Sequence, residues 1–491
     1  MAAPAEASLL LDRSLPRGTV VRLAPGVRGW ANASALIGGS PWRISRVSGR
    51  VRTVVANLLA NGRTGVEASD RQTLAIFRML VDRGLAIVAR TPEESLGDAS
   101  IVIPAMDRAD SLGLTLHSVF GARSVTVVDD GSLDPASVAA AAARHGATVV
   151  VHEANRGPAA ARNTGIAASC GEFVAFLDSD CIAPPGWPDS MLNHFVDPAV
   201  AAVAPRVQAN PAGHSVIDRY ETTRSALDMG AFPGLVRPGS RLGFLPTAAL
   251  IVRRSALGAG FDENLRLGED VDLIWRLTDA GWHVLYDPSV IVAHSTRARP
   301  RAWLTRRFEY GTSAAALSRR HPDKLTPARL SFWNVAALGL LAVGRPLLGA
   351  LVTASAAGAL LRQFRVLDNP ELLAARTVGQ SLVADAAGIG RLLRREWWPV
   401  GAVALAMSPR SRIARTATAC MLAPIAWAYA MRRPPLDPAR YLALHLVDDA
   451  AYGTGVLIAC LRARRIAPLT PTIRMPNSFT GLFSYFHRPG Y

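Results

Sequence analysis

The sequence predicts an α/β protein built around a Rossmann-like, mostly parallel sheet, with a winged-helix-like module before it and a helical region after it. Apolar strands alternate with helices over residues 100–177, which is typical of a parallel sheet covered by helices. Short strands and two helices precede this domain in residues 10–90, and apolar segments separated by arginines follow it in residues 301–491. Half of the 491 residues are hydrophobic, which excludes global disorder.

In the N-terminal module, residues 10–90, apolar residues alternate with polar ones in some segments and recur at helical spacing in others. Short strands around two helices suit a winged-helix-like module, and a generic α+β appendage is the alternative. A polar, acidic segment at residues 91–100 is expected to link this module to the next domain. The predicted elements are strands over residues 19–23, 41–45 and 85–89 and helices over residues 51–60 and 71–82.

The central domain begins with a regular alternation of apolar strands and helices. Ligands of such sheets bind beyond the carboxyl ends of the strands, so the polar residues that directly follow strands are the candidate site residues. The predicted elements are strands over residues 100–104, 124–128, 148–152 and 173–177 and helices over residues 112–120, 136–145 and 159–168.

The positive charge of the chain belongs to its C-terminal region. The chain has 54 Lys and Arg against 38 Asp and Glu, a net charge of +16. Residues 1–300 carry 29 basic and 29 acidic side chains, whereas residues 301–491 carry 25 and 9. Because the positive and negative charges of the first 300 residues balance and the sequence has no nucleic-acid-binding motif, nucleic acid is not an expected partner. The C-terminal excess instead favours contact with anionic lipid.

Three uncharged apolar segments, residues 332–344, 347–361 and 416–431, lie among these arginines. None reaches the ~20 residues that cross a bilayer. They could form interfacial or re-entrant helices, marginal spans or a buried bundle, and we expect contact with a membrane surface. The N-terminus lacks the pattern of a secretory signal, and the four cysteines have neither disulfide-framework nor metal-ligand spacing. We therefore expect a location in the cytoplasm or on the cytoplasmic face of the cell membrane.

Two motifs place acidic residues directly after predicted strands. In VVDDGS, Asp129 and Asp130 could hold a base or a ribose, or could simply cap the next helix. In FLDSD, Asp178 and Asp180 project to the same side of an extended segment, so both carboxylates can converge on a divalent cation and a bound diphosphate. Hard oxygen ligands favour Mg²⁺ or Mn²⁺. Stability alone poorly explains two carboxylates that repel each other at a strand end.

Two further motifs open helices. In NRGPAAARNTG, small residues can pack against the sheet, and Arg162 could face a phosphate or form a structural clamp with an aspartate. GEDVDLIWRL has three acidic residues in its first turn, which the helix dipole favours. Functionally, Asp270 could be a general base that deprotonates an acceptor hydroxyl. His294 follows a predicted strand, where it could complete a metal site or be an ordinary polar strand-end residue.

Taken in order, these motifs resemble glycosyltransferase family 2, whose catalytic domain has the GT-A fold. The resemblance covers roughly residues 98–300 and includes IVIPAMDR, VVDDGS, NRGPAAARNTG, FLDSD, LPTAALIVRRSAL and GEDVDLIWRL. It implies a nucleotide-sugar site lined by six residues and a metal site formed by two. The nucleotide-sugar residues are Pro104, Ala105, Met106, Asp130, Arg162 and Asp178, and the metal ligands are Asp180 and His294.

The resemblance also implies an inverting, single-displacement transfer. Asp270 would be the catalytic base, Glu269 its neighbour and a ligand of the acceptor, and the cation would neutralise the leaving diphosphate. The acceptor would lie between residues 245–257 and 269–272. Processive synthases of this family carry Gln-x-x-Arg-Trp after the base helix, whereas residues 296–320 contain RRFEYG instead. A long polymer is therefore not an expected product.

The order of the three parts resembles a narrower group, the glycosyltransferases of the mycofactocin system. In that group a module similar to PqqD-type peptide-binding proteins precedes the transferase. This resemblance implies transfer of a hexose, with UDP-glucose as the expected donor, to the peptide-derived cofactor mycofactocin or its precursor. Two other hypotheses are a membrane-bound transferase of cell-envelope glycans with a lipid-linked acceptor, and a catalytically silent peptide-binding adaptor. The presence of Asp178, Asp180 and Asp270 argues against the silent adaptor.

Overall fold

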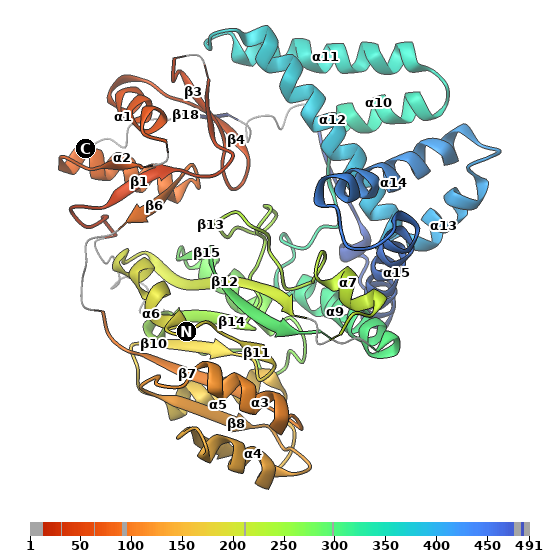
Figure 1. Cartoon of the computed structure of the whole chain (residues 1–491). Helices are drawn as coiled ribbons and strands as arrows, with labels where there is room; N and C mark the ends of the chain where they lie inside the picture. Colours follow the sequence, from red (N-terminus) through yellow and green to blue (C-terminus); the bar gives the residue numbers. More distant parts are fainter. Residues whose placement is uncertain are drawn as a thin grey trace, which may run out of the picture. The chain divides into compact units, whose positions relative to one another are not determined.

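A computed structural model describes residues 13–30, 32–62, 64–90, 96–210, 213–296, 299–475 and 483–485. The chain divides into two compact units (Figure 1). The first contains the residues up to Ala209 together with Ala226–Ser295, and the second contains Asn210–Ser225 and Thr296–Ser484. The predicted α/β architecture with a helical C-terminal region is confirmed.

The N-terminal part of the first unit consists of two helices and two small sheets. β1 pairs with β5 and β6 in one antiparallel sheet, and β3 pairs with β2 and β4 in another. Both helices bury apolar residues in one core, including Leu58 and Phe77. All five predicted elements are present, whereas β2, β3 and β5 have only two to four residues and were not predicted. The elements are β1 (Val20–Leu23), β2 (Arg28–Trp30), β3 (Ala35–Gly38), β4 (Arg43–Arg46), α1 (Gly49–Ala60), β5 (Val66–Glu67), α2 (Arg71–Asp82) and β6 (Ala86–Arg90).

The remainder of the first unit is a mixed sheet in the order β11-β15-β12-β14-β10-β7-β8-β9, with β13 beside β15. Strands β10, β7, β8 and β9 are parallel, and β14 is antiparallel to β10. Every strand and helix predicted for this region is confirmed. The elements are β7 (Ala99–Ala105), α3 (Ala109–Ser118), β8 (Val125–Asp129), α4 (Pro135–Ala143), β9 (Thr148–Val151), α5 (Pro158–Ala168), β10 (Phe173–Leu177), β11 (Cys181–Ile182), α6 (Trp187–Leu192), β12 (Val200–Asn210), β13 (Gly234–Leu235), β14 (Ala249–Arg253), α8 (Glu269–Asp279) and β15 (His283–Ser295).

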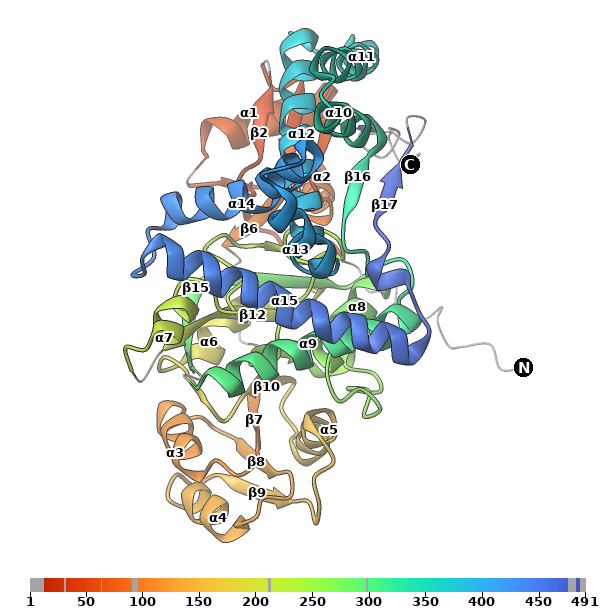
Figure 2. The ribbon, with the colours of Figure 1, turned by 90° about the vertical axis from the view of Figure 1, so that its right-hand side faces the viewer.

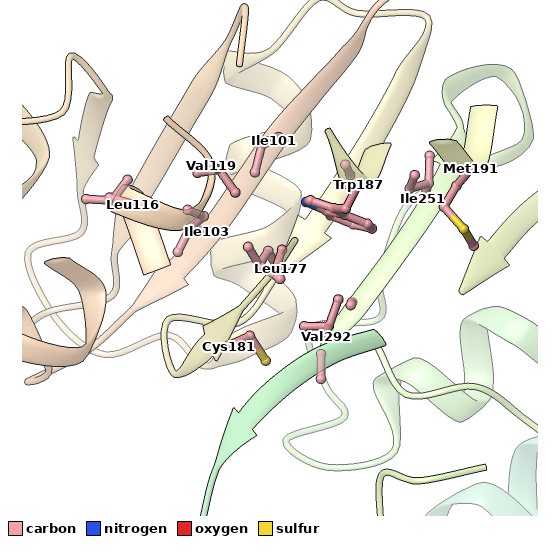
Figure 3. Close-up of a cluster of buried hydrophobic side chains, with 14 of the residues drawn as sticks. Ile101, Ile103, Leu116, Val119, Leu177, Cys181, Trp187, Met191, Ile251 and Val292 are labelled. Atoms are coloured by element: carbon pink, nitrogen blue, oxygen red, sulfur yellow. The ribbon is translucent and has the colours of Figure 1, made fainter. Parts of the chain in front are cut away.

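Helices cover both faces of the parallel strands. Figure 2 shows α3 and α4 on one face and α5 on the other. On the first face, Leu116 of α3 and Trp187 of α6 join sheet residues such as Ile103 in a continuous buried cluster (Figure 3). On the second face, α5 lies so close to β7 that a Cβ added at Gly165 would be 2.1 Å from Val102 Cγ1. Small residues of the NRGPAAARNTG motif therefore allow α5 to approach the sheet.

The second unit is helical and is built around the pair α9–α15. The two helices approach closely at glycines, because a Cβ added at Gly311 would be 2.1 Å from the carbonyl oxygen of Tyr452 and one added at Gly455 would be 2.0 Å from that of Phe308. The described elements of this unit are α7 (Val216–Glu221), α9 (Pro300–Arg320), β16 (Arg329–Ser331), α10 (Phe332–Ala342), α11 (Pro346–Phe364), α12 (Pro370–Arg394), α13 (Trp398–Met407), α14 (Arg412–Arg432), α15 (Pro438–Ala463) and β17 (Thr472–Arg474).

Buried ion pairs connect the helices of this unit. Arg307 of α9 pairs with Glu221 of α7 and, at 2.9 Å, with Asp448 of α15. Arg394 of α12 bonds to Asp449 at 3.0 Å. Arg307 belongs to RRFEYG, the segment that replaces the Gln-x-x-Arg-Trp pattern of the processive synthases. In this chain, that segment therefore holds the helical unit together.

All three apolar C-terminal segments are helical, in α10, α11 and α14. By length and composition alone, two described helices could cross a bilayer, namely α11 and α15. However, α15 carries the buried Asp448 and Asp449, which pair with arginines inside the unit. Of the apolar window of α15, 39% is buried inside the structure, compared with 22% of the apolar window of α11.

We expect Gly165→Ala to destabilise the first unit, because the added methyl group overlaps Val102. Overpacking of this kind costs about 1–3 kcal/mol. The midpoint of thermal unfolding, followed by circular dichroism, measures the effect. Gly113→Ala is the matched control, since no atom lies within 4 Å of the added Cβ in α3, and it should leave the midpoint unchanged or raise it. Equal midpoints for the two variants would contradict the close packing of α5.

Candidate active site

Three parallel strands bring the predicted site residues to one edge of the sheet. β7, β8 and β10 end at this edge. Pro104 and Ala105 are the last residues of β7 and Met106 follows it, while Asp130 and Asp178 directly follow β8 and β10. The ends of β7 and β8 are tied together, since Asp130 N donates to Ala105 O at 2.9 Å. Ala105 is buried and Met106 is exposed, so the loop after β7 extends from the core to the surface.

Asp130 anchors the start of α5. Its buried carboxylate accepts hydrogen bonds from Arg156 N at 3.0 Å and Gly157 N at 2.8 Å, and lies 2.8 Å from His152 Nδ1. Gly157 has a φ of +95°, a conformation that favours glycine. A carboxylate offers about four lone-pair positions, so Asp130 keeps room for one more donor. His152 was not predicted as a site residue, although its place at the end of the predicted strand 148–152 indicated the same edge.

The neighbouring Asp129 carries an oxygen without a partner. Its Oδ1 accepts from Ser132 N at 3.0 Å and from Ser132 Oγ at 2.5 Å. Its Oδ2 is buried and, among the described residues, has no hydrogen-bond donor. An N–H or O–H group of a ligand could satisfy this oxygen, which is costly to leave unpaired. Of the two aspartates of VVDDGS, only Asp130 is a predicted site residue.

Arg162 forms a clamp between two carboxylates. The guanidinium is 4% exposed, and its Nη2 and Nη1 donate to Asp178 Oδ1 at 2.9 Å and to Glu269 Oε1 at 2.8 Å. Arg162 therefore forms the structural clamp with an aspartate that was one of the two expectations for NRGPAAARNTG. The sequence did not indicate Glu269 as its second partner. The clamp connects the end of β10 to the first turn of α8.

Asp180 and His294 lie together because β11 pairs with β15. Cys181 is opposite His294 in that register, and His294 Nε2 lies 3.4 Å from Asp180 Oδ1. Arg108, which was not predicted as a site residue although IVIPAMDR contains it, pairs with Asp180 Oδ2. A carboxylate suits Mg²⁺ or Mn²⁺, whereas an imidazole is a ligand more typical of transition metals than of Mg²⁺. No three His, Cys, Asp or Glu side chains within the described residues are grouped to hold a metal alone, so diphosphate and water oxygens would have to complete the shell.

Asp270 is the acidic residue of the first turn of α8 that is not clamped. Gly268 caps the helix in a left-handed conformation, and the Asp270 carboxylate accepts a hydrogen bond from Val271 N at 2.8 Å. Burial and the negative charge of Glu269 raise the pKa of Asp270 to about 7, although Arg162 partly opposes the shift. A carboxylate with such a pKa is suited to accept a proton near neutral pH.

The predicted walls of the acceptor site also lie beside these residues. β14 pairs with β10, and Asp178 N donates to Ala248 O at 2.9 Å. On α8, Trp275 Nε1 donates to Gly243 O at 2.8 Å, which ties the base helix to the segment before β14. Ala248 thus joins residues 245–257 to Asp178, and the Arg162 clamp joins Asp178 to the first turn of α8.

The chain is similar in sequence to known glycosyltransferases. The model of the family described as Glycosyl transferase family 2 matches residues 100–260. The "Pre-mycofactocin glycosyltransferase" of Mycobacterium tuberculosis is 38% identical over 474 residues, which cover 94% of this chain and 99% of that protein. "Succinoglycan biosynthesis protein ExoU" of Rhizobium meliloti is 35% identical over 201 residues, 36% of this chain and 56% of that protein. Among solved structures, a mannosyltransferase of Pyrobaculum calidifontis matches with a TM-score of 0.37 and 22% identity, covering 61% of this chain and 88% of that one.

We expect Arg162→Gln to lower the free energy of unfolding by about 3–5 kcal/mol, because it leaves Glu269 buried without its counter-charge. The double variant Arg162→Gln/Glu269→Gln should be more stable than Arg162→Gln alone. Urea unfolding of the wild type, both single variants and the double variant gives the coupling energy. Additive effects would show that the two side chains do not form a clamp.

Proposed function

Because the chain belongs to glycosyltransferase family 2, we propose that it transfers a hexose from a nucleotide sugar to the peptide-derived precursor of mycofactocin. The observation that carries this proposal is the 38% identity to the pre-mycofactocin glycosyltransferase, which extends over 94% of the chain and thus over all three of its parts. The donor in this proposal is UDP-glucose, and the transfer inverts the anomeric configuration.

The proposed donor site is the sheet edge at the ends of β7, β8 and β10. The backbone of Pro104–Met106 and the carboxylate of Asp130 would line the base pocket, and Asp129 Oδ2 is available to a further donor group of the nucleotide. Asp178 would contact the nucleotide sugar, while Arg162 would hold this carboxylate in position. Asp180 and His294 would hold Mg²⁺ or Mn²⁺. A bound cation would supply positive charge to the leaving diphosphate.

Asp270 is the proposed general base. Glu269 is paired with Arg162 and Asp272 with Arg276, which leaves Asp270 as the carboxylate of this turn that can receive a proton from the acceptor hydroxyl. The acceptor would lie between Asp270 and the segment that leads into β14. In-line attack on the anomeric carbon would then displace the nucleoside diphosphate.

The two flanking parts have separate proposed roles. Residues 10–90 are the proposed PqqD-like module, which would hold the peptide precursor or a maturation partner. The C-terminal helical region, with its excess of arginine, would bring the enzyme to the cytoplasmic face of the cell membrane. In the sequence, the catalytic domain proposed for residues 98–300 separates these two parts.

A panel of nucleotide sugars tests the proposal. The purified chain is incubated with each sugar, with Mg²⁺, Mn²⁺ or EDTA, and with or without the peptide-derived acceptor, and product masses are recorded. We expect a hexose increment with UDP-glucose only when both the acceptor and a divalent cation are present. If no sugar adds a hexose to this acceptor, the proposed acceptor is wrong. Product formed in EDTA would instead contradict the metal dependence.

We expect Asp270→Asn to lower the transfer rate about 10²- to 10⁴-fold while leaving the donor affinity unchanged, because an amide cannot accept the proton. Asp279→Asn, at the exposed end of the same helix, is the matched control and should retain activity. Rates come from product mass, and donor affinity comes from calorimetry. Loss of donor binding in Asp270→Asn would show that Asp270 is not the base.

The rate should also depend on pH through Asp270. Its pKa of about 7 reflects burial and the charges of Glu269 and Asp178, opposed by Arg162. Because only the ionised form accepts a proton, the rate under single-turnover conditions should fall about tenfold per pH unit below 7 and level off above it. A rate that is constant between pH 5 and 8 would exclude a base with this pKa.

A further inference from the structure

Two helical hairpins of the second unit contain arginine as their only charged residue type. The hairpins are α10–α11, residues 332–364, and α13–α14, residues 398–432, and neither contains Asp, Glu or Lys. The buried ion pairs of this unit use other arginines, including Arg224, Arg307 and Arg394. The charge of the hairpins is therefore uncompensated within their own sequence. Their arginines are Arg345, Arg362, Arg410, Arg412, Arg415 and Arg432.

Most of the large apolar side chains that are exposed also lie in this part of the chain. Among the described residues, 31 such side chains are exposed, and 17 of them lie within the 102 residues from 332 to 433. Leu347, in the first turn of α11, is 85% exposed, and Ile413, in the first turn of α14, is 58% exposed. Exposed apolar side chains that gather in one patch normally mark a contact with another molecule or a membrane.

The turns of the two hairpins lie next to each other. A Cβ added at Gly344, in the turn of α10–α11, would be 2.8 Å from Arg412 Nη1, in the first residue of α14. Figure 1 draws both turns at the right-hand end of their hairpins. The helices α11 and α14 begin at these turns, so two helix N-termini add partial positive charge there. We call this surface the hairpin-tip patch; it comprises Val343, Arg345, Leu347, Leu348, Met407, Arg410, Arg412 and Ile413.

We propose that the hairpin-tip patch docks the enzyme on a bilayer that contains anionic phospholipid. The five apolar side chains of the patch would enter the boundary between headgroups and acyl chains, and the three arginines would bind lipid phosphates. A partner without negative charge would leave these arginines without counter-charges. This inference rests on the membrane contact in the proposed function and is independent of the proposed acceptor.

Vesicle co-sedimentation tests the patch. The full chain is mixed with vesicles of phosphatidylcholine alone or of phosphatidylcholine with phosphatidylglycerol. The wild type should bind the anionic vesicles, and salt should weaken binding. The variant Arg345→Gln/Arg410→Gln/Arg412→Gln should bind them on the order of 100-fold more weakly, since each arginine near the surface contributes roughly fivefold. Leu347→Asn/Ile413→Asn should also bind more weakly, and both side chains are exposed enough for the fold to tolerate the change.

Matched controls remove the same groups elsewhere. Arg71→Gln/Arg90→Gln/Arg144→Gln removes three exposed arginines of the first unit, and Leu114→Asn/Phe120→Asn removes two exposed apolar side chains of the same unit. Both controls should bind vesicles like the wild type. Size-exclusion chromatography with light scattering should give the same mass for the wild type and the two patch variants.

Three results would overturn the proposal. Equal loss of vesicle binding in the arginine control would show that total charge, and not the patch, determines binding. Failure of the wild type to bind any vesicle would show that the protein does not contact the membrane. A wild-type dimer that the patch variants dissociate would identify a second copy as the occupant. Hexose transfer measured without vesicles should be unchanged in the patch variants, so the test of the proposed activity stays separate.

Discussion

The catalytic region depends on one buried guanidinium. Arg162 reaches from α5 to the end of β10 and to the first turn of α8, and its two hydrogen bonds hold Asp178 and Glu269. Without this charge, two carboxylates and Asp270 would repel one another at the edge of the sheet. The clamp therefore allows a negatively charged cluster to form where a nucleotide sugar and a cation would bind. It also leaves Asp270 as the acidic side chain of that turn with a raised pKa.

The close packing of α5 makes this reach possible. Gly165 brings the helix against Val102 of β7, and Asp130 fixes the start of the helix through the backbone of Arg156 and Gly157. Arg162 lies between these two fixed points. The small residues of the NRGPAAARNTG motif thus set the distance between the helix and the sheet. At that distance the long side chain of Arg162 reaches both carboxylates.

The spacing of apolar residues in the sequence predicts most of the helices and strands, but it does not predict which polar groups pair with each other. The alternation of strands and helices predicted every element from β7 to β10, because each is long enough to show its period. The aspartates after β8 and β10 were predictable from their position alone. Arg108 and His152 were not, because their partners Asp180 and Asp130 lie 72 and 22 residues away in the sequence. The unpaired oxygen of Asp129 was not predictable either, because the sequence does not show which donors surround a buried group. The alternatives for Arg162 could be separated only by the structure.

The arginines of the C-terminal region divide into two populations with different physical roles. Arg307 and Arg394 are buried, and each has an acidic partner on α15, so they stabilise the helical unit from within. Arg345 and Arg410 are exposed on helical hairpins that contain no acidic residue at all. A buried charge without a partner destabilises a fold, and an exposed one does not, so only the second population is free to meet an external anion. The net charge of the whole chain combines these two populations, and only the exposed one supports the proposed contact with a membrane surface.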